Sequence, residues 1–75
     1  MTQTIAITGA TGFAGRHVVA ELVKRGHRLR ALVRNPATAG LPEQVQLVQG
    51  DLEDSAALDD LLRDADALVH LAGAI

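Results

Sequence analysis

Four short segments rich in aliphatic residues recur along the 75 residues of this chain, and turn residues separate them. Segments of this kind are typical of buried β-strands. After the first segment, and again before the fourth, apolar residues repeat at helical spacing. Strands that alternate with helices form a parallel sheet covered on both faces, so the pattern predicts an α/β fold. The expected strands are residues 4–8, 28–34, 45–51 and 67–73.

Two helices are expected between these strands. The first covers residues 13–25, and Gly26 follows where a left-handed glycine ends many helices. The second begins at Asp54 or Ser55, either of which can cap it. Residues 37–44 have no apolar period and predict a loop or a single turn. The apolar positions of the first helix are Ala14, Val18 and Leu22, with Val19 and Val23 beside them.

Composition narrows the class of protein. With 48% hydrophobic and 21% charged residues, the chain is suited to one folded domain and not to a disordered tail. Its net charge of −2 argues against nucleic acid as a partner. It has no cysteine, and so neither a disulfide nor a thiolate nucleophile. Because no apolar stretch is long enough to span a bilayer and the N-terminus lacks a basic leader region, we expect no membrane partner and a cytoplasmic location.

Three glycines lie in "TGATGFAG", between the first expected strand and the first expected helix. A helix N-terminus carries unpaired N–H groups and a partial positive charge, which together attract anions. In dinucleotide-binding turns the first glycine allows the tight turn, the second the close approach of the phosphates, and the third the close packing of helix on strand. Gly9, Gly12 and Gly15 fit these roles in order. A tight turn without a ligand fits a bare triplet too, but the flanking strand and helix favour nucleotide binding.

The spacing of these glycines resembles the T-G-x-x-G-x-x-G signature of the short-chain dehydrogenase/reductase superfamily. "ITGATGFAGRHVVAELVKRGH" is similar to its extended and atypical branches, which include NAD-dependent epimerases/dehydratases and NmrA-like proteins. "GDLED" and "ALVHLAG" resemble the ends of the family's third and fourth strands. The resemblance implies half of a doubly wound Rossmann fold, with four parallel strands in the order 3-2-1-4. Residues 1–75 would then be a partial NAD(P)-binding domain without the later strands and the substrate-binding part.

The resemblance also implies roles for residues at the strand ends. Asp51 would hydrogen-bond the adenine amine, with an ordinary strand-end turn as the alternative, and Leu52 would pack near the adenine ring. The backbone of residues 71–73 would pass the ribose nearer the nicotinamide. The cofactor-binding residues that we predict are Gly9, Thr11, Gly12, Phe13, Ala14, Gly15, Arg34, Asn35, Asp51, Leu52, Leu71, Ala72 and Gly73.

The residue at the end of the second strand bears on which cofactor is bound. NAD-binding proteins usually place an acidic residue there, about 20 residues after the glycines, against the ribose 2′-OH. This chain has Arg34, followed by Asn35. A guanidinium pairs well with a 2′-phosphate, so the sequence favours NADP, with NAD as the alternative. A solvated charge is the other interpretation of Arg34, and Arg16 has the same two interpretations.

No catalytic or metal-ligating residue is predicted in this chain. The family's chemistry depends on a Tyr-x-x-x-Lys pair, but the chain has no tyrosine, and its only lysine, Lys24, falls on the polar face of the first helix. His17 and His27 are expected at the surface, and His70 as a hydrogen-bonded residue of the core. None of them has a metal-ligand spacing with a carboxylate.

We therefore expect the chain to bind the ADP and pyrophosphate part of a nicotinamide dinucleotide, as the N-terminal half of an oxidoreductase or a nucleotide-sugar epimerase-like enzyme. A non-catalytic NADP sensor of the NmrA-like type is one alternative. A structural fragment that assembles without useful binding is another. The fourth strand would be an uncharged apolar edge, which predicts a homodimer that pairs two such edges.

Overall fold

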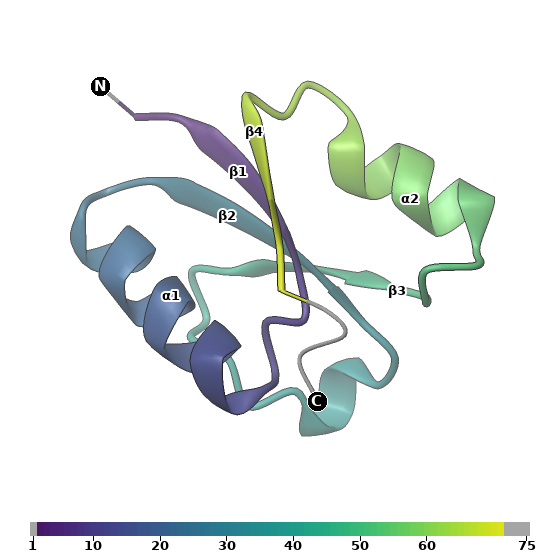
Figure 1. The fold of residues 1–75 in the computed structure, drawn as a ribbon, viewed down its shortest axis with the longest axis horizontal. Helices are drawn as coiled ribbons and strands as arrows, with labels where there is room; N and C mark the ends of the chain where they lie inside the picture. The colour runs from purple at the N-terminus through teal and green to yellow at the C-terminus, as the bar shows by residue number, and fades with distance from the viewer. Residues whose placement is uncertain (1, 72–75) are drawn as a thin grey trace.

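The computed structural model describes residues 2–71 and contains one four-stranded parallel sheet (Figure 1). The strand order is β3-β2-β1-β4, which confirms the predicted order 3-2-1-4. The two helices and one 3₁₀ turn follow the strands as the sequence predicts. In chain order the elements are β1 (Thr4–Thr8), α1 (Phe13–Lys24), β2 (Arg28–Val33), η1 (Pro36–Thr38), β3 (Gln46–Gln49), α2 (Ser55–Leu62) and β4 (Ala67–His70).

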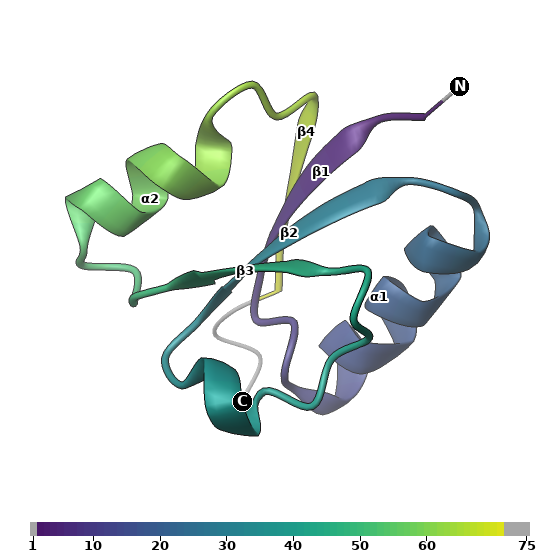
Figure 2. The same cartoon turned by 180° about the vertical axis from the view of Figure 1, so that it is seen from behind.

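The sheet separates two apolar layers, because alternate side chains of each strand point to opposite faces. Figures 1 and 2 show α1 on one face of the sheet and α2 on the other. On the α1 face, Ile7 and Val19 are buried together, and on the α2 face Ala6 packs with Leu61. Alternate residues of β2, namely Leu29, Ala31 and Val33, all belong to the cluster on the α1 face.

The apolar face of α1 differs from the prediction by one position. Val19 is 1% exposed and Gly15 is buried, whereas Ala14 is exposed and Val18 is only half-buried. The face is centred on Gly15 and Val19 because the glycine lets this side of the helix lie against the turn that follows β1. Helical periodicity of apolar residues does not reveal this, because glycine has no side chain and is not counted among the apolar positions.

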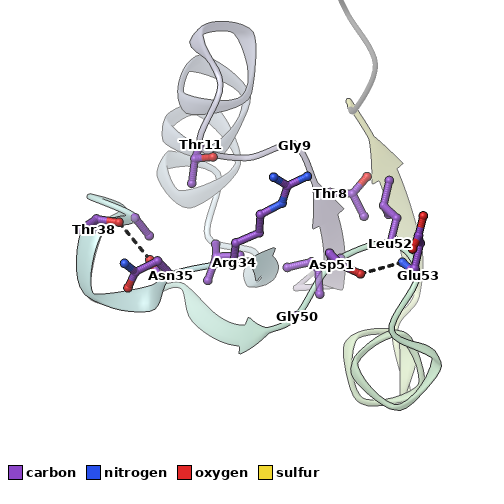
Figure 3. Close-up of a pocket in the computed structure, with 13 residues that line it drawn as sticks. Thr8, Gly9, Thr11, Arg34, Asn35, Thr38, Gly50, Asp51, Leu52 and Glu53 are labelled. Carbon is purple, nitrogen blue, oxygen red and sulfur yellow. Dashed lines mark hydrogen bonds between the residues drawn. The ribbon is translucent and has the colours of Figure 1, made fainter.

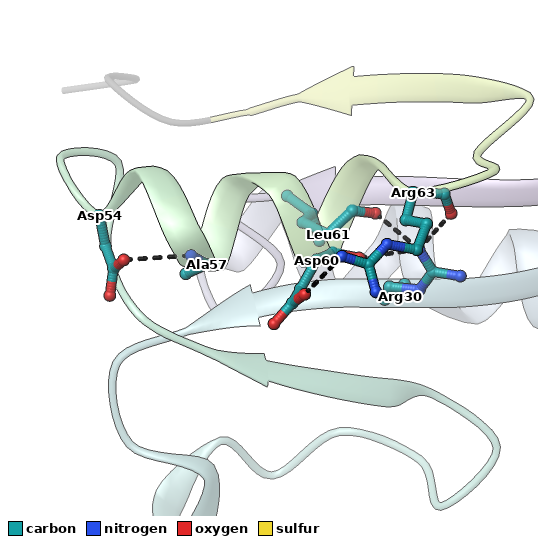
Figure 4. Close-up of polar contacts among 6 residues, drawn as sticks. All are labelled: Arg30, Asp54, Ala57, Asp60, Leu61 and Arg63. Atoms are coloured by element: carbon teal, nitrogen blue, oxygen red, sulfur yellow. Dashed lines mark hydrogen bonds and ion pairs between the residues drawn. The ribbon is translucent and has the colours of Figure 1, made fainter.

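Both helix ends that the sequence predicts are present. Gly26 has φ 84°, and its N–H donates to the Val23 carbonyl at 2.9 Å. The next N–H, of His27, donates to the Leu22 carbonyl at 3.2 Å, which completes a Schellman motif. At the start of α2, the Asp54 carboxylate accepts a hydrogen bond from the Ala57 N–H at 3.0 Å (Figure 4).

The third strand is shorter than the predicted residues 45–51. The Val45 N–H donates to the Pro42 carbonyl at 3.0 Å, closing a turn, so the ladder begins one residue later. At the other end, Gly50 passes so close to Ala57 of α2 that a side chain there would overlap it. The fourth strand is Ala67–His70, shorter than the predicted residues 67–73: Leu71 follows it, and Ala72 and Gly73 lie outside the described residues.

Arg30 of β2 ties the sheet to the C-terminal end of α2 (Figure 4). Its Nη1 donates to the carbonyl oxygens of Asp60 at 3.0 Å, Leu61 at 3.0 Å and Arg63 at 2.7 Å. The last carbonyls of a helix have no partner within the helix, and a cation there also complements its dipole. Arg30 therefore caps α2 from the sheet, a role that the sequence analysis did not predict.

Replacing Arg30 by Met should lower the free energy of unfolding by about 1–3 kcal/mol, because three carbonyl groups lose their charged donor and the hydrogen bond to one of them, that of Leu61, is partly buried. Urea denaturation followed by circular dichroism measures this change. Arg28→Met, at an exposed position of the same strand, is the matched control and should stay within about 0.5 kcal/mol of the parent. Equal stability of the two variants would contradict the capping role.

Candidate functional site

A pocket of about 880 Å³ opens at the carboxyl ends of β1, β2 and β3 (Figure 3). Ligands of open parallel sheets bind at this edge, outside the carboxyl ends of the strands. The loops that leave the three strands form its walls. The lining residues are Thr8, Gly9, Thr11, Leu32, Val33, Arg34, Asn35, Thr38, Ala39, Gly50, Asp51, Leu52 and Glu53.

The glycine turn leads from β1 into α1 at one side of the pocket. Gly9 has φ 79°, in the left-handed region that favours glycine, and its carbonyl accepts a hydrogen bond from the Gly12 N–H at 3.2 Å. Gly12 is the N-cap of α1 and has extended backbone angles. A Cβ on Gly12 would lie 3.5 Å from the Gly9 carbonyl oxygen, an ordinary contact. The fold therefore does not itself require glycine at position 12.

Gly15 is different, because the backbone of the turn lies directly against it. A Cβ at this position would lie 2.7 Å from Ala10 Cα and 2.8 Å from the Ala10 carbonyl carbon, and it would overlap the Gly9 oxygen. These are backbone atoms, which cannot move aside as the end of a flexible side chain can. Gly15 thus allows α1 to start close to the end of β1.

The start of α1 has no side-chain cap among residues 2–71. Its N-cap is a glycine, no side chain of that range caps its first turn by a hydrogen bond, and the turn contains no acidic residue. In the same chain, α2 is capped by the Asp54 carboxylate. The N-terminus of α1 consequently presents N–H groups and the positive end of the helix dipole without an opposing side-chain charge.

Arg34 directly follows β2, and its side chain reaches into the pocket in the view of Figure 3. The residue is exposed and forms no ion pair within residues 2–71. It also borders a second, shallower hollow of about 440 Å³, which Asp51 and Asp54 line with it. Arg34 and Asp51 therefore line both hollows, so a cation and a carboxylate lie at the same edge of the sheet.

Asn35 and Asp51 each hold a turn of the pocket wall through a side-chain oxygen. Asn35 Oδ1 accepts from the Ala37 N–H at 3.1 Å and caps η1. Asp51 Oδ1 accepts from the Glu53 N–H at 2.9 Å (Figure 3). The strand-end turn that was the alternative role of Asp51 is thus present, and it uses one of the two carboxylate oxygens.

The structure brings six of the predicted residues together in this pocket: Gly9, Thr11, Arg34, Asn35, Asp51 and Leu52. It leaves Gly12, Phe13, Ala14, Gly15 and Leu71 outside the lining. Phe13 is 83% exposed, and its ring contacts the His17 ring edge-on at 5.0 Å between centroids. The Leu71 N–H donates to the Thr8 carbonyl at 2.9 Å, which continues the pairing of β4 with β1. Ala72 and Gly73 lie outside the described residues.

Several lining residues were not predicted, among them Thr8, Thr38 and Glu53. The signal that would have found most of them is the position of each at a strand's carboxyl end or in the loop after it. Thr8 is 3% exposed and shares a hydrogen bond with Nδ1 of His70. His70 is hydrogen-bonded as expected, but it is exposed at the edge of the sheet and not part of the core.

Residues 2–71 contain neither a candidate metal site nor a candidate membrane-spanning helix. That range has no cluster of three histidine, cysteine or acidic residues that could hold a metal ion. None of its helices is long and apolar enough to cross a bilayer.

Residues 9–75 match the protein family described as NAD(P)H-binding. A ceramide reductase from Caulobacter vibrioides is 47% identical over 75 residues, covering 95% of this chain and 23% of that protein. A short-chain dehydrogenase/reductase superfamily protein from Agrobacterium tumefaciens, solved with bound NAD, is 37% identical with a TM-score of 0.75, covering 91% of this chain and 20% of its own. NmrA, a negative transcriptional regulator solved with NADP, is 25% identical with a TM-score of 0.79, covering 92% and 23%. The chain thus spans less than a quarter of each of these proteins.

Gly15→Ala should destabilise the fold by about 1–3 kcal/mol, because the new methyl group overlaps backbone atoms of the turn. Gly12→Val should leave the free energy of unfolding within about 1 kcal/mol of the parent, since position 12 has extended angles and a Cβ there would make only an ordinary contact. Thermal or urea denaturation of both variants measures the difference. A stable Gly15→Ala protein would show that α1 does not depend on this contact.

Proposed function

Because this chain belongs to the NAD(P)H-binding family of the short-chain dehydrogenase/reductase superfamily, we propose that it binds a nicotinamide dinucleotide through the ADP and pyrophosphate part. The observation that carries this proposal is the uncapped start of α1, which directly follows the pocket-lining residues Gly9 and Thr11. A pyrophosphate is an anion of the kind that such a helix end holds, through backbone N–H groups and the dipole. Gly12 has no side chain to keep the phosphates from these N–H groups.

The other lining residues fit the adenosine end of the ligand. Asp51 uses one carboxylate oxygen for its own turn, which leaves the second for the adenine amine. Leu52 is 47% exposed at the wall of the pocket and offers an apolar surface to the ring. These roles agree with those that the family resemblance implies, and together with the glycine turn they account for the ADP half of the cofactor.

Binding and orientation are the tasks that this chain's own residues perform in the proposal. A bound nicotinamide dinucleotide supplies hydride transfer. We place no proton-transfer step on the chain, which has no tyrosine. For the whole protein we propose an oxidoreductase or epimerase-like enzyme, since a 47% identical relative is a ceramide reductase. A regulator that senses NADP is the second candidate, favoured by the similarity to NmrA.

Calorimetric titration of the chain with NADPH and NADH tests the binding proposal. Saturable binding of at least one of them is expected. Gly12→Val should weaken it roughly tenfold or more, because a side chain at position 12 keeps the phosphates from the N–H groups, and one charged hydrogen bond is worth about 1.5–3 kcal/mol. Circular dichroism confirms that the variant is folded. Undiminished binding by folded Gly12→Val would place the ligand elsewhere.

Arg34 is the proposed determinant of cofactor choice. It follows β2 at the position where NAD-binding proteins usually have an acidic residue, and its guanidinium forms no ion pair with any of residues 2–71. A planar guanidinium suits the bidentate recognition of a 2′-phosphate. We therefore propose a preference for NADP over NAD.

Arg34→Asp should reverse this preference. The difference between the binding free energies of NADPH and NADH should change by about 1.5–3 kcal/mol. The variant loses a charged hydrogen bond to the 2′-phosphate and places a second negative charge beside it. Arg28→Asp, an exposed arginine at the other end of β2, is the matched control and should keep the ratio of the parent. A ratio unchanged by Arg34→Asp would mean that Arg34 is a solvated charge.

The free edge of β4 is the proposed surface for self-association. The strand Ala67–His70 pairs with β1 on one side, and no other strand among residues 2–71 pairs with its second side. Leu68 is 50% exposed at this edge, and Leu62 of α2 is 44% exposed. The strand carries no lysine, arginine or acidic residue that would oppose pairing with an identical edge. Two copies related by a two-fold axis can join their β4 strands antiparallel.

Sedimentation velocity of the 75-residue chain should accordingly show a dimer at micromolar concentration. Leu68→Lys should give a folded monomer, because it places two charges at the centre of the paired edges. Leu52→Lys, which changes a similarly exposed leucine that is not part of β4, should remain dimeric. A parent chain that sediments as a monomer would refute this arrangement.

A further inference from the structure

Arg16, the residue after the third glycine, joins α1 to the segment that follows η1. Its Nη1 donates to the Gly40 carbonyl oxygen at 2.9 Å, and its Nη2 donates to the Ala39 carbonyl oxygen at 3.0 Å. One planar guanidinium thus holds two successive carbonyl groups. Arg16 is therefore neither a free solvated charge nor an unoccupied phosphate donor in this structure, and these were its two expected roles.

The segment held by Arg16 is a wall of the pocket. Ala39 is 3% exposed and belongs to the core cluster on the α1 face, and it also lines the pocket together with Asn35 and Thr38. Figure 2 shows the chain after η1 passing the N-terminal end of α1 on its way to β3. The same residue, Arg16, lies one turn of helix after the N-cap Gly12, whose carbonyl accepts its backbone N–H at 3.0 Å.

Gly40 is shaped for this contact. Its φ of +65° is one that side-chain-bearing residues rarely adopt, and a Cβ there would lie 3.2 Å from Arg16 Nη1 and 3.5 Å from Nη2. A residue other than glycine would therefore both strain the backbone and press on the guanidinium. The contact depends on two positions 24 residues apart in the chain.

We propose that Arg16 is a positioning residue, which fixes the wall formed by residues 35–40 at the distance from the α1 N-terminus that a dinucleotide requires. The part concerning the ligand rests on the proposed function, whereas the contact itself belongs to the protein without ligand. Both Nη groups that face the wall are engaged by backbone carbonyls, so Arg16 acts on the whole pocket and not on the 2′-phosphate. It therefore contributes equally to the affinity for NADP and for NAD, in contrast to Arg34.

The first experiment measures the wall without any cofactor. Hydrogen exchange is followed at the Thr38 and Ala39 amides, which donate to the Asn35 and Pro36 carbonyls. Arg16→Gln should speed exchange at these amides several-fold, because the wall then opens more often. Exchange at the Ala57 amide in α2 should not change. Arg25→Gln, an exposed arginine at the other end of α1, is the matched control and should leave the wall as in the parent.

The second experiment titrates the same variants with NADPH and NADH. Arg16→Gln should lower the population of the conformation in which the wall can bind a cofactor. The apparent affinity for both cofactors should then fall by the same factor, roughly 3–10-fold. Gly40→Ala should have a similar effect, since it disturbs the contact from the other side. The double variant should lose less than the product of the two single losses, because both remove one contact.

The outcomes separate the two proposals. A loss of NADPH affinity alone would make Arg16 a phosphate ligand and overturn the positioning role, as would unchanged exchange at Thr38 and Ala39 in Arg16→Gln. Faster exchange at the wall in a chain whose parent binds neither cofactor would support the contact and refute the proposed function.

Discussion

The close approach of α1 to the end of β1 is the constraint on which the other features of this molecule depend. At Gly15 the helix lies against the backbone of Gly9 and Ala10 with no room for a methyl group. This contact sets where the helix starts and which of its faces covers the sheet, with Val19 at the centre. It also brings the N–H groups of the first turn to the edge where the strands end. The packing of α1 and the position of the candidate binding site therefore both depend on a glycine at position 15.

Two arginine side chains donate hydrogen bonds to backbone carbonyl groups at the end of α2 and in the segment after η1. Arg30 reaches from β2 to the last turn of α2, and Arg16 reaches from α1 to the segment after η1. Each joins two elements of the chain, because a long side chain can reach carbonyl groups that lie beyond the apolar core. In a chain with one aromatic residue, these polar connections complement a core of small aliphatic side chains.

The regular part of the fold could be predicted from local pattern. β1 matches its predicted residues, the strand order matches, and Gly26 and Asp54 end and begin the helices as expected. Such features depend on residues close together in sequence. A glycine after a helix and an aspartate before one favour a helix end and a helix start, respectively.

Features that depend on distant residues could not be predicted in this way. The partners of Arg16 and Arg30 lie 23 to 33 residues further along the chain, so an arginine in the sequence looks the same whether it is solvated or bonded. The exposure of His70 follows from its place at a sheet edge, which an apolar neighbourhood in the sequence conceals. For the candidate site, the sequence identified the glycine turn and the charged or polar strand ends, whereas the wall after η1 emerged only from the fold.

The pairing of β1 has a consequence for how the chain folds. β1 is central in the sheet, yet its partner β4 is the last strand within residues 2–71, and the pairing between them joins residues 62 apart in sequence. Contacts of such separation close late and slow the folding of small domains. During synthesis the apolar strand Thr4–Thr8 leaves the ribosome before its partners and can pair with β2 once α1 and β2 have followed, but its other edge stays open until β4 has been made. The strand that ends most buried is thus the one exposed longest, and it is the segment of a nascent chain that a chaperone would shield.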